Sequence, residues 1–308
     1  MVARHTTAFE ALLVDSAFEG EVFRNEPMAR HTTYRIGGRA RYFIQVSTLD
    51  ALSKLVALCT KQDISWIVIG KGSNLLVSDA GFDGVIITLG QDFRLCRFDD
   101  EHLCFTVGAG ATLAVVVQEA FKRGLAGLEF AVGTPGTMGG ALRMNAGSAQ
   151  EWIGARVRWV LTFSAKKGLR RYQGSDIVWS YRASSIPADE IILECEIAVE
   201  KGQSSVIREK MEQAHIKRKA NQPLNYPSCG SVFKNPEGKA AATLIEQIGL
   251  KGYRIGGAMV SELHANFIVN VGNARADDVV ELIRLIQTKV NDTYDIELQP
   301  EVKFLGFA

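Results

Sequence analysis

Residues 133–147 constrain the fold of this chain more than any other stretch. They read Gly-Thr-Pro-Gly-Thr-Met-Gly-Gly-Ala-Leu-Arg-Met-Asn-Ala-Gly, with five glycines among fifteen residues. Glycine adopts positive φ angles and lets another molecule come close to backbone N–H groups. Met138, Leu142 and Met144 add apolar anchors, which a mobile Gly/Ser linker lacks. We therefore expect a bare-backbone surface for a long, flat, phosphate-bearing cofactor; a mobile surface loop is the alternative.

A second glycine loop spans residues 70–75 and reads Gly-Lys-Gly-Ser-Asn-Leu. Apolar strand-like segments lie on both sides of it. A P-loop or Rossmann turn would instead be followed by a helix whose N-terminus holds the phosphate. Phosphate binding at this loop would therefore use a nest of backbone amides with Ser73 and Asn74. A plain β-turn is the alternative.

Gly108-Ala109-Gly110 lies between a predicted strand at 103–107 and a predicted helix at 112–123. This order resembles half of a dinucleotide-binding fingerprint. However, Leu113 occupies the third glycine position, and no parallel strand ending in an acidic residue follows at the right distance. We predict an ordinary strand-to-helix turn here.

Apolar periodicity predicts an α+β chain of several packed parts. A shift in charge near Lys201 places a boundary at about residue 200, which gives an N-terminal segment 1–25, a domain 26–200 that splits near 90, and a domain 201–308. The predicted strands are 40–46, 66–69, 75–77, 85–89, 103–107, 157–164, 169–172, 191–199, 265–271 and 296–304; the predicted helices are 48–59, 112–123, 206–219, 240–248 and one that begins near 277.

The composition argues against several functional classes. The 308 residues carry a net charge of +1, which gives no field to attract nucleic acid or an acidic membrane. No apolar run approaches the roughly 20 residues of a membrane span, and the N-terminus lacks a signal-peptide core. The five cysteines form no C-x-x-C pair and do not cluster with histidine. We expect reduced thiols, no metal site and a cytoplasmic protein.

Three short segments carry more chemistry than a turn or strand end needs. Tyr181-Arg182 places a guanidinium among aromatic and serine residues, although a surface ion pair would look the same. Glu301 follows Pro300 at an otherwise apolar strand end, where a solvated glutamate is the default. Residues 227–236 combine two prolines with a glycine and serines, and present a polar set that a rigid turn does not require: Ser231, Lys234 and Asn235.

These motifs together resemble the UDP-N-acetylenolpyruvoylglucosamine reductase (UDP-N-acetylmuramate dehydrogenase) family of flavoenzymes in peptidoglycan precursor synthesis. The resemblance runs from about residue 30 to the C-terminus. It includes Ser-Val-Phe-Lys-Asn-Pro at 231–236, which is far more specific than the glycine loops alone. The other matching pieces are Thr33-Tyr34-Arg35-Ile36-Gly37-Gly38, residues 70–75, Gly133-Thr134-Pro135-Gly136, Asn145-Ala146-Gly147, Ser180-Tyr181-Arg182 and Glu301.

The resemblance implies a two-subdomain FAD-binding fold of the vanillyl-alcohol-oxidase (PCMH) type over 26–200, followed by an α+β substrate-binding domain. It implies NADPH as co-substrate and Arg182, Ser231 and Glu301 as the catalytic residues. The residues expected at FAD are Tyr34, Arg35, Gly70, Lys71, Gly72, Ser73, Asn74, Leu75, Gly133, Thr134, Pro135, Gly136, Gly139, Gly140, Asn145, Ala146 and Gly147. The residues expected at the substrate are Tyr181, Arg218, Lys234 and Asn235, and no metal is expected.

The reaction implied is reduction of an enolpyruvyl sugar nucleotide. Hydride comes from flavin N5, and Ser231 is the candidate proton donor. Arg182 offers a fork that matches the substrate carboxylate. Glu301 would act protonated or would hold Arg182, and the sequence leaves both open. Residues 191–193 follow Arg182 too soon for the tyrosine loop of one subclass, so the chain resembles the shorter subclass.

Two other functions remain in view. An FAD-dependent sugar or alcohol oxidase of the same cofactor fold would use oxygen, but no His or Cys between 70 and 92 or between 127 and 147 could tether its flavin. A non-enzymatic flavin- or nucleotide-sugar-binding protein would have no use for a catalytic set. We expect a small-molecule nucleotide-sugar substrate, no nucleic acid or membrane partner, and no need for an oligomer.

Overall fold

The computed structural model describes residues 8–148 and 150–307. These residues form two compact units, each with its own core. The first unit comprises residues up to 24, 42–70 and 84–214, and the second comprises 25–41, 71–83 and 215 to the C-terminus. Each unit therefore takes residues from distant parts of the chain. The predicted division into 1–25, a cofactor-binding domain 26–200 and a substrate-binding domain 201–308 concerns the roles of these segments, and it stays a prediction.

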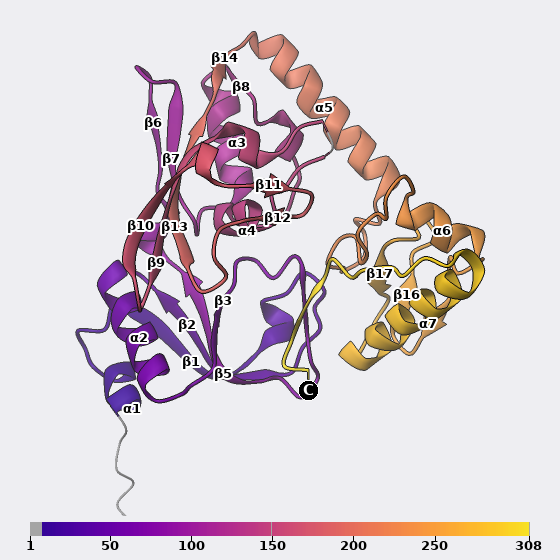
Figure 1. Ribbon diagram of the computed structural model, residues 1–308, viewed down its shortest axis with the longest axis horizontal. Helices are drawn as coiled ribbons and strands as arrows, with labels where there is room; N and C mark the ends of the chain where they lie inside the picture. The colour runs from indigo at the N-terminus through magenta and orange to yellow at the C-terminus, as the bar shows by residue number, and fades with distance from the viewer. Residues whose placement is uncertain (1–7, 149, 308) are drawn as a thin grey trace, which may run out of the picture. The chain divides into compact units, whose positions relative to one another are not determined.

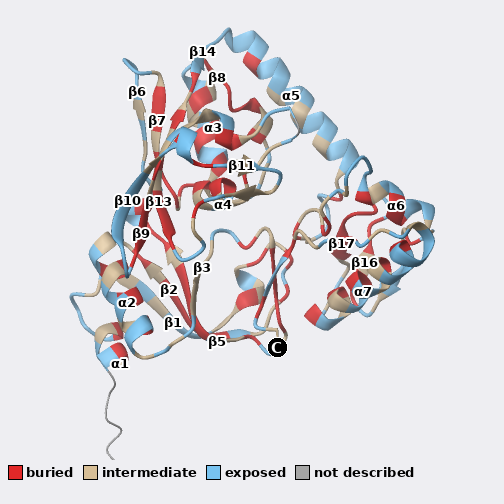
Figure 2. Ribbon diagram, viewed as in Figure 1, coloured by how far each residue is buried: buried red, intermediate tan, exposed pale blue. Residues whose placement is uncertain are grey.

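A five-stranded antiparallel sheet dominates the first unit (Figure 1). Its spatial order is β10-β9-β13-β7-β6, and β9 and β13 are eight-residue strands that pair along most of their length. The strand bounds are β6 Cys96–Asp99, β7 Cys104–Gly108, β9 Val157–Ser164, β10 Gly168–Gln173 and β13 Ile191–Ala198. Figure 2 shows buried residues along β7, β9 and β13, which form the core of this unit.

The helices of the first unit form where capping and apolar spacing agree. In α2 (Leu49–Lys61), the Thr48 hydroxyl accepts from the N–H of Ala51, and Leu52, Leu55 and Val56 are fully buried. In α3 (Leu113–Lys122), Thr112 plays the same capping role. The remaining elements of the unit are α1 Ala8–Leu13, α4 Met138–Arg143, β3 Trp66–Val68 and the two-stranded pairs β8 Leu125–Ala126 with β14 Glu200–Lys201 and β11 Trp179–Ser180 with β12 Ala183–Ser184.

A four-stranded sheet has the order β1-β2-β5-β3, with β1 Gly20–Pro27, β2 Arg39–Val46 and β5 Phe82–Leu89. In it β3 pairs with β5 in parallel. The chain passes from one unit to the other within β1, β2 and β5, and again within the long helix α5 (Ser204–Asn221). Only Ile207 of α5 is buried, so the helix is exposed along most of its length (Figure 2).

The second unit packs helices against a small antiparallel sheet (Figure 1). The sheet is β15-β16-β17, with β15 Arg254–Ile255, β16 Ala258–Val260 and β17 Ile268–Asn270, and the helices are α6 Ala241–Gln247 and α7 Ala276–Tyr294. In α7 the predicted apolar face of Val279, Leu282, Ile283, Ile286 and Val290 is buried. A separate parallel pair joins β4 (Leu75–Val77) to β18 (Lys303–Leu305), so residues after the glycine loop lie beside the end of the chain.

Most predicted elements are confirmed, with bounds that differ by a few residues. The predicted closing strand at 296–304 is largely wrong, because only residues 303–305 form a strand and Pro300 makes a single isolated bridge. The elements that were not predicted are the helices α1 and α4 and the strands β1, β6, β8, β11, β12, β14, β15 and β16. The first seven residues of the predicted segment 1–25 lie outside the described residues.

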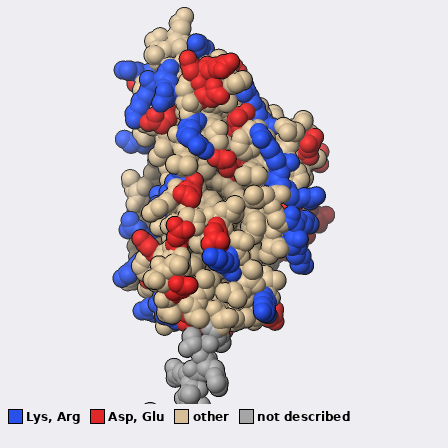
Figure 3. Space-filling model, turned by 90° about the vertical axis from the view of Figure 1, so that its left-hand side faces the viewer, with Lys and Arg blue, Asp and Glu red and all other residues tan. Residues whose placement is uncertain are grey.

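The surface carries both signs of charge. Lys and Arg side chains are interspersed with Asp and Glu on the face that Figure 3 shows, as the net charge of +1 suggests. Among the described residues, no helix combines the length and the apolarity that crossing a bilayer requires.

Candidate functional site

The glycine-rich run at 133–147 contains the short helix α4, and only one face of this helix packs against the core. Met138 and Leu142 are fully buried and anchor the run as predicted, whereas Met144 is only half-buried. Gly133, Pro135 and Gly140 are exposed. The outward side of the run is therefore mostly main chain, which a flat ligand can approach closely.

The turn at 108–111 is hydrogen-bonded to the start of α4 in this run. The N–H of Gly139 donates to the carbonyl of Ala109 at 2.9 Å, and the N–H of Met138 donates to Ala111 at 2.8 Å. A side chain at Gly108 would place a Cβ 2.1 Å from the carbonyl oxygen of Phe93. Packing thus accounts for glycine here, and the predicted turn from a strand to a helix is confirmed as the turn between β7 and α3; that it binds no dinucleotide stays a prediction.

The first residue of the second glycine loop, Gly70, lies in the same unit and comes close to the run. A Cβ at Gly70 would lie 2.5 Å from Oγ1 of Thr137, the residue that caps α4. Any larger residue at position 70 would displace this cap. Within the first unit, Gly70 therefore packs directly against Thr137 of the glycine-rich run.

Arg182 lies at the turn between β11 and β12, and this hairpin is tied to the end of the glycine-rich run. Its Nη1 donates to the carbonyl of Gly147 at 2.9 Å. The side-chain amide of Asn145 donates to the carbonyl of Ser180 at 3.1 Å. Arg182 has a φ of 56°, a conformation that is costly for a residue with a side chain. The guanidinium also lies 5.2 Å from the centre of the exposed Tyr181 ring.

The rest of the second glycine loop, residues 71–75, belongs to the second unit. Gly72 has a φ of 61°, and a Cβ there would lie 2.2 Å from the carbonyl oxygen of His31. The side-chain amide of Asn74 donates to the carbonyl of Glu301 at 3.1 Å, and the carbonyl of Asn74 accepts from the N–H of Lys303 at 3.0 Å. The loop predicted to hold phosphate is thus bonded directly to the segment that carries Glu301.

Ser231 and Glu301 are brought together by backbone pairing within the second unit. The N–H of Glu301 donates to the carbonyl of Val232 at 2.7 Å, and the N–H of Lys234 donates to Gln299 at 2.9 Å. Phe233 and Pro300 form an antiparallel bridge between these bonds. Glu301 is therefore in register with the residue that follows Ser231. Both residues are partly exposed, as groups that contact a ligand must be.

Asn266, which sequence reasoning missed, holds the Ser231 segment in place. It is 4% exposed. Its Oδ1 accepts from the N–H of Phe233 at 2.9 Å, and its Nδ2 donates to the carbonyl of Phe233 at 2.8 Å. Its own carbonyl accepts from the N–H of Val232. An asparagine within an apolar strand pattern was the sequence signal that could have pointed to it.

Tyr34, predicted at the cofactor, has a fully buried side chain in the core of the second unit. Its hydroxyl donates to the carbonyl of Ile268 at 2.8 Å. Only its backbone can therefore contact a ligand, whereas its neighbour Arg35 is exposed. Cys229 is buried in the same core, and burial raises the pKa of its thiol to about 12. The prediction that Cys229 packs in the interior is confirmed.

The residues predicted at the substrate differ in their surroundings. Lys234, three residues after Ser231, is half-buried. Oδ1 of Asn235 accepts from the N–H of Ala241 at 3.0 Å, which braces the start of α6. Arg218 is half-buried near the end of α5, and burial lowers its pKa, so it is not simply a solvated surface charge.

The predicted catalytic residues thus fall into two groups. Arg182 belongs to the first unit with the run at 133–147, and Ser231 and Glu301 belong to the second unit with Asn74. That all three act on one substrate stays a prediction. No group of three or more His, Cys, Asp or Glu side chains within 8–148 and 150–307 is placed to hold a metal ion.

The donor set suits a flavin dinucleotide. In the first unit, the exposed main chain around Gly133 and Gly140 suits a flat ring. In the second unit, Gly72 adds no side chain, and Lys71 and Ser73 carry polar groups suited to phosphate oxygens. The residues present therefore fit the cofactor that the sequence predicts.

Comparisons with known proteins point the same way. Residues 40–164 match the family described as FAD binding domain. Residues 222–305 match the family described as UDP-N-acetylenolpyruvoylglucosamine reductase, C-terminal domain.

Whole-length relatives carry the same name. A UDP-N-acetylenolpyruvoylglucosamine reductase of Heliobacterium modesticaldum is 43% identical over 291 residues, covering 94% of this chain and 92% of the relative. One of Caldanaerobacter subterraneus is 41% identical over 289 residues, covering 94% and 95%. The crystal structure of UDP-N-acetylenolpyruvylglucosamine reductase from Thermus caldophilus matches with a TM-score of 0.80 and 34% identity, covering 93% of this chain and 99% of that chain.

Proposed function

Because the chain belongs to the UDP-N-acetylenolpyruvoylglucosamine reductase family, we propose that it reduces the enolpyruvyl ether of UDP-N-acetylglucosamine to UDP-N-acetylmuramate, with FAD as cofactor and NADPH as electron donor. This step belongs to peptidoglycan precursor synthesis. The structural observation that carries the proposal is the pairing of Glu301 with Val232, which sets a carboxyl group beside the Ser231 segment.

The cofactor would be held by main chain more than by side chains. The run at 133–147, with Gly70 against Thr137, supplies the face for the flavin ring system, and Lys71 to Leu75 supply donors for phosphate oxygens. Held there and reduced by NADPH, FAD would supply the hydride that the methylene carbon of the enolpyruvyl group needs.

Arg182 would stabilise the negative charge that develops on the substrate. When the methylene carbon gains a hydride, negative charge grows on the adjacent carbon and spreads into the carboxylate. A guanidinium fixed in advance stabilises such charge better than mobile water does. Its bond to the carbonyl of Gly147 holds it at the end of the flavin-binding run.

Ser231 and Glu301 would supply the proton that the reduced substrate needs. The Ser231 hydroxyl donates a proton to the carbon that carries the developing charge, and general acid catalysis of this kind contributes about 10²- to 10⁴-fold. A protonated Glu301 could return a proton to the serine oxygen or share the carboxylate charge; an ionised Glu301 could instead orient Arg182. The pairing with the Ser231 segment favours the first role.

The nucleotide part of the substrate needs cationic and amide donors. Lys234, Arg218 and Asn235 are the side chains that we assign to it, with Tyr181 near the sugar. We further assign the protein to the cytoplasm, with a small-molecule nucleotide sugar as substrate, no nucleic acid or membrane partner, and no requirement for an oligomer. In place of the tyrosine loop of the longer subclass, another residue must cover the nucleotide.

The proposal is tested by stoichiometry. Each enolpyruvyl nucleotide reduced should consume one NADPH, with no hydrogen peroxide formed. An oxidase of the same cofactor fold would consume oxygen and release peroxide, and a binding protein would retain the ligand without turnover. Steady peroxide formation with an alcohol or sugar in place of NADPH consumption would refute the proposal.

A further inference from the structure

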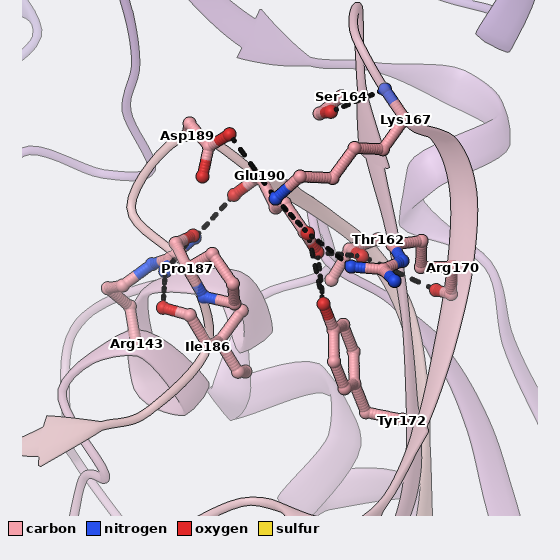
Figure 4. A network of polar contacts seen from close by, with 10 residues as sticks. All are labelled: Arg143, Thr162, Ser164, Lys167, Arg170, Tyr172, Ile186, Pro187, Asp189 and Glu190. Atoms are coloured by element: carbon pink, nitrogen blue, oxygen red, sulfur yellow. Dashed lines mark hydrogen bonds and ion pairs between the residues drawn. The ribbon is translucent and has the colours of Figure 1, made fainter.

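Arg143, the last residue of α4, uses its side chain to hold a distant stretch of chain. Its guanidinium donates to three backbone carbonyls: Ile186 at 2.7 Å, Pro187 at 2.9 Å and Glu190 at 2.5 Å. Figure 4 shows the side chain pointing into the curve of this segment. Burial lowers the pKa of Arg143, but an arginine stays charged at neutral pH. One cation therefore binds the end of the flavin-binding run to residues 186–190.

The far end of that segment is fixed by Glu190. Its side chain is only 1% exposed. Oε2 accepts from the Thr162 hydroxyl at 2.6 Å, and the Tyr172 hydroxyl lies 2.9 and 3.0 Å from the two carboxylate oxygens. Lys167 and Arg170 place cationic nitrogens 3.6 and 3.7 Å from Oε1 (Figure 4). A buried carboxylate with this many partners is held rigidly, because losing any of them leaves buried charge unsatisfied.

Between these anchors and the glycine-rich run lies the hairpin that carries Arg182. Three bonds join the two: the Ser184 hydroxyl to the carbonyl of Arg143 at 3.4 Å, the Asn145 amide to the carbonyl of Ser180, and the Arg182 guanidinium to the carbonyl of Gly147. The hairpin has only two paired residues in each strand, so it cannot hold its own shape in water. Its position depends on what surrounds it.

We infer that Arg143 and Glu190 are positioning residues for Arg182: they clamp residues 183–190 to the end of the glycine-rich run, so that the Arg182 guanidinium stays where charge develops on the substrate. The inference rests on the proposed function. It assigns no contact with substrate or cofactor to either residue. A displacement of about 1 Å at a catalytic group can cost on the order of 10²-fold in rate, which sets the size of the expected effect.

The test follows two half-reactions of the holoenzyme separately by stopped flow. Flavin bleaching by NADPH reports the first, and reoxidation by the enolpyruvyl nucleotide reports the second. Arg143→Met should slow reoxidation by about 10- to 100-fold while bleaching changes by less than about threefold. Arg143→Lys should recover part of the loss, because an ammonium can still donate to one or two of the carbonyls. Arg171→Met, at an exposed arginine of β10 outside the clamp, should leave both rates unchanged.

A double-mutant cycle shows whether the effect passes through Arg182. In an Arg182→Ala background, Arg143→Met should slow reoxidation by no more than about twofold further. A full, additive effect in that background would overturn the inference, since Arg143 would then act without Arg182. Equal slowing of both half-reactions by Arg143→Met alone would overturn it as well, because a general loosening of the flavin site would explain that result.

A milder variant covers the case in which Arg143→Met fails to fold or to retain FAD. Glu190→Gln keeps the backbone carbonyl that Arg143 binds but removes the buried charge. It should slow reoxidation by about three- to tenfold, again with no further loss when Arg182 is alanine; an unchanged rate would overturn the inference. The unmutated enzyme tests the proposed function itself: if NADPH bleaches its flavin but the nucleotide does not reoxidise it, the proposed function is wrong. Failure of the proposed function is therefore distinguished from failure of the inference about Arg143 and Glu190.

Discussion

The side-chain amide of Asn74 donates to the backbone carbonyl of Glu301 at 3.1 Å, across 227 residues of sequence. The carbonyl of Asn74 accepts from the N–H of Lys303 in turn. A residue that the sequence assigned to the cofactor thus holds the backbone of a residue assigned to catalysis. The prediction that Asn74 contacts the cofactor therefore implies that cofactor binding and the placement of Glu301 are coupled through one side chain.

Asn74→Ala tests this coupling. It removes the amide donor, so the free energy of unfolding should fall by about 1 kcal/mol, and the product-forming half-reaction should slow about tenfold because Glu301 is less well placed. Denaturant titration and stopped-flow reoxidation measure the two effects. Asn291→Ala, at an exposed position of α7, is the control. A product-forming rate equal to that of the parent would show that the bond does not position Glu301.

Ser231→Ala should separate the two half-reactions. Loss of the proton donor should slow product formation by about 10²- to 10⁴-fold, whereas NADPH should still bleach the flavin at the parent rate. Rapid-mixing absorbance of the flavin follows both steps. If both half-reactions slow equally, Ser231 is a structural residue of the loop and not the proton donor.

Asn266→Ala should destabilise the second unit. The residue is buried and makes two side-chain bonds to the backbone of Phe233. Truncation leaves those groups unsatisfied, at about 1–3 kcal/mol each. We expect the free energy of unfolding to fall by about 2–6 kcal/mol, measured by urea titration. Little change in stability would mean that water replaces both bonds.

Alkaline pH should destabilise the protein through its buried thiols. Burial raises the pKa of Cys229 to about 12 and of Cys59 to about 12. Unfolded thiols lose their protons near pH 8.5, so above that pH the unfolded state binds fewer protons than the folded state. The free energy of unfolding is therefore unaffected by these groups below about pH 8.5 and falls as pH rises toward their folded pKa, by up to about 1.4 kcal/mol per pH unit for each group.

Cys229→Ala checks this account. Between pH 9 and 11 the variant should lose stability less steeply with pH than the parent, by about 1.4 kcal/mol per pH unit at most. Denaturant titrations at several pH values provide the slopes. Identical slopes for variant and parent would show that Cys229 ionises as readily in the folded protein as in the unfolded chain.

The sequence predicted those elements that are stabilised by interactions between residues close together in the chain. The helices α2, α3 and α7 each repeat buried apolar residues at helical spacing, and α2 and α3 also carry a side-chain cap. The helix α4 was missed because two of its six residues are glycine, which lowers helix propensity. It forms because Thr137 caps it and the turn at 109–111 fixes its first N–H groups.

Long-range relationships had no such local signal. Residues 25–41 and 71–83 pack with the C-terminal third of the chain, although nothing in their own composition indicates a partner. The closing segment 296–304 looked like a strand because its apolar residues alternate, yet its backbone bonds go to single residues in the Ser231 loop and to Asn74. The family resemblance identified Arg182, Ser231 and Glu301 as candidates. The roles of Asn266, Glu190 and Arg143, by contrast, could be inferred only from their contacts in the structure.

The central claim is that FAD reduced by NADPH reduces an enolpyruvyl nucleotide in this protein, with Arg182 stabilising the developing charge and with Ser231 and Glu301 supplying the proton. An anaerobic two-step titration tests it most directly. The purified yellow protein should be bleached by one equivalent of NADPH, and one equivalent of UDP-N-acetylglucosamine enolpyruvate should then restore the flavin absorbance. A bleached protein that stays colourless with the nucleotide and regains colour only when oxygen is admitted would contradict the account.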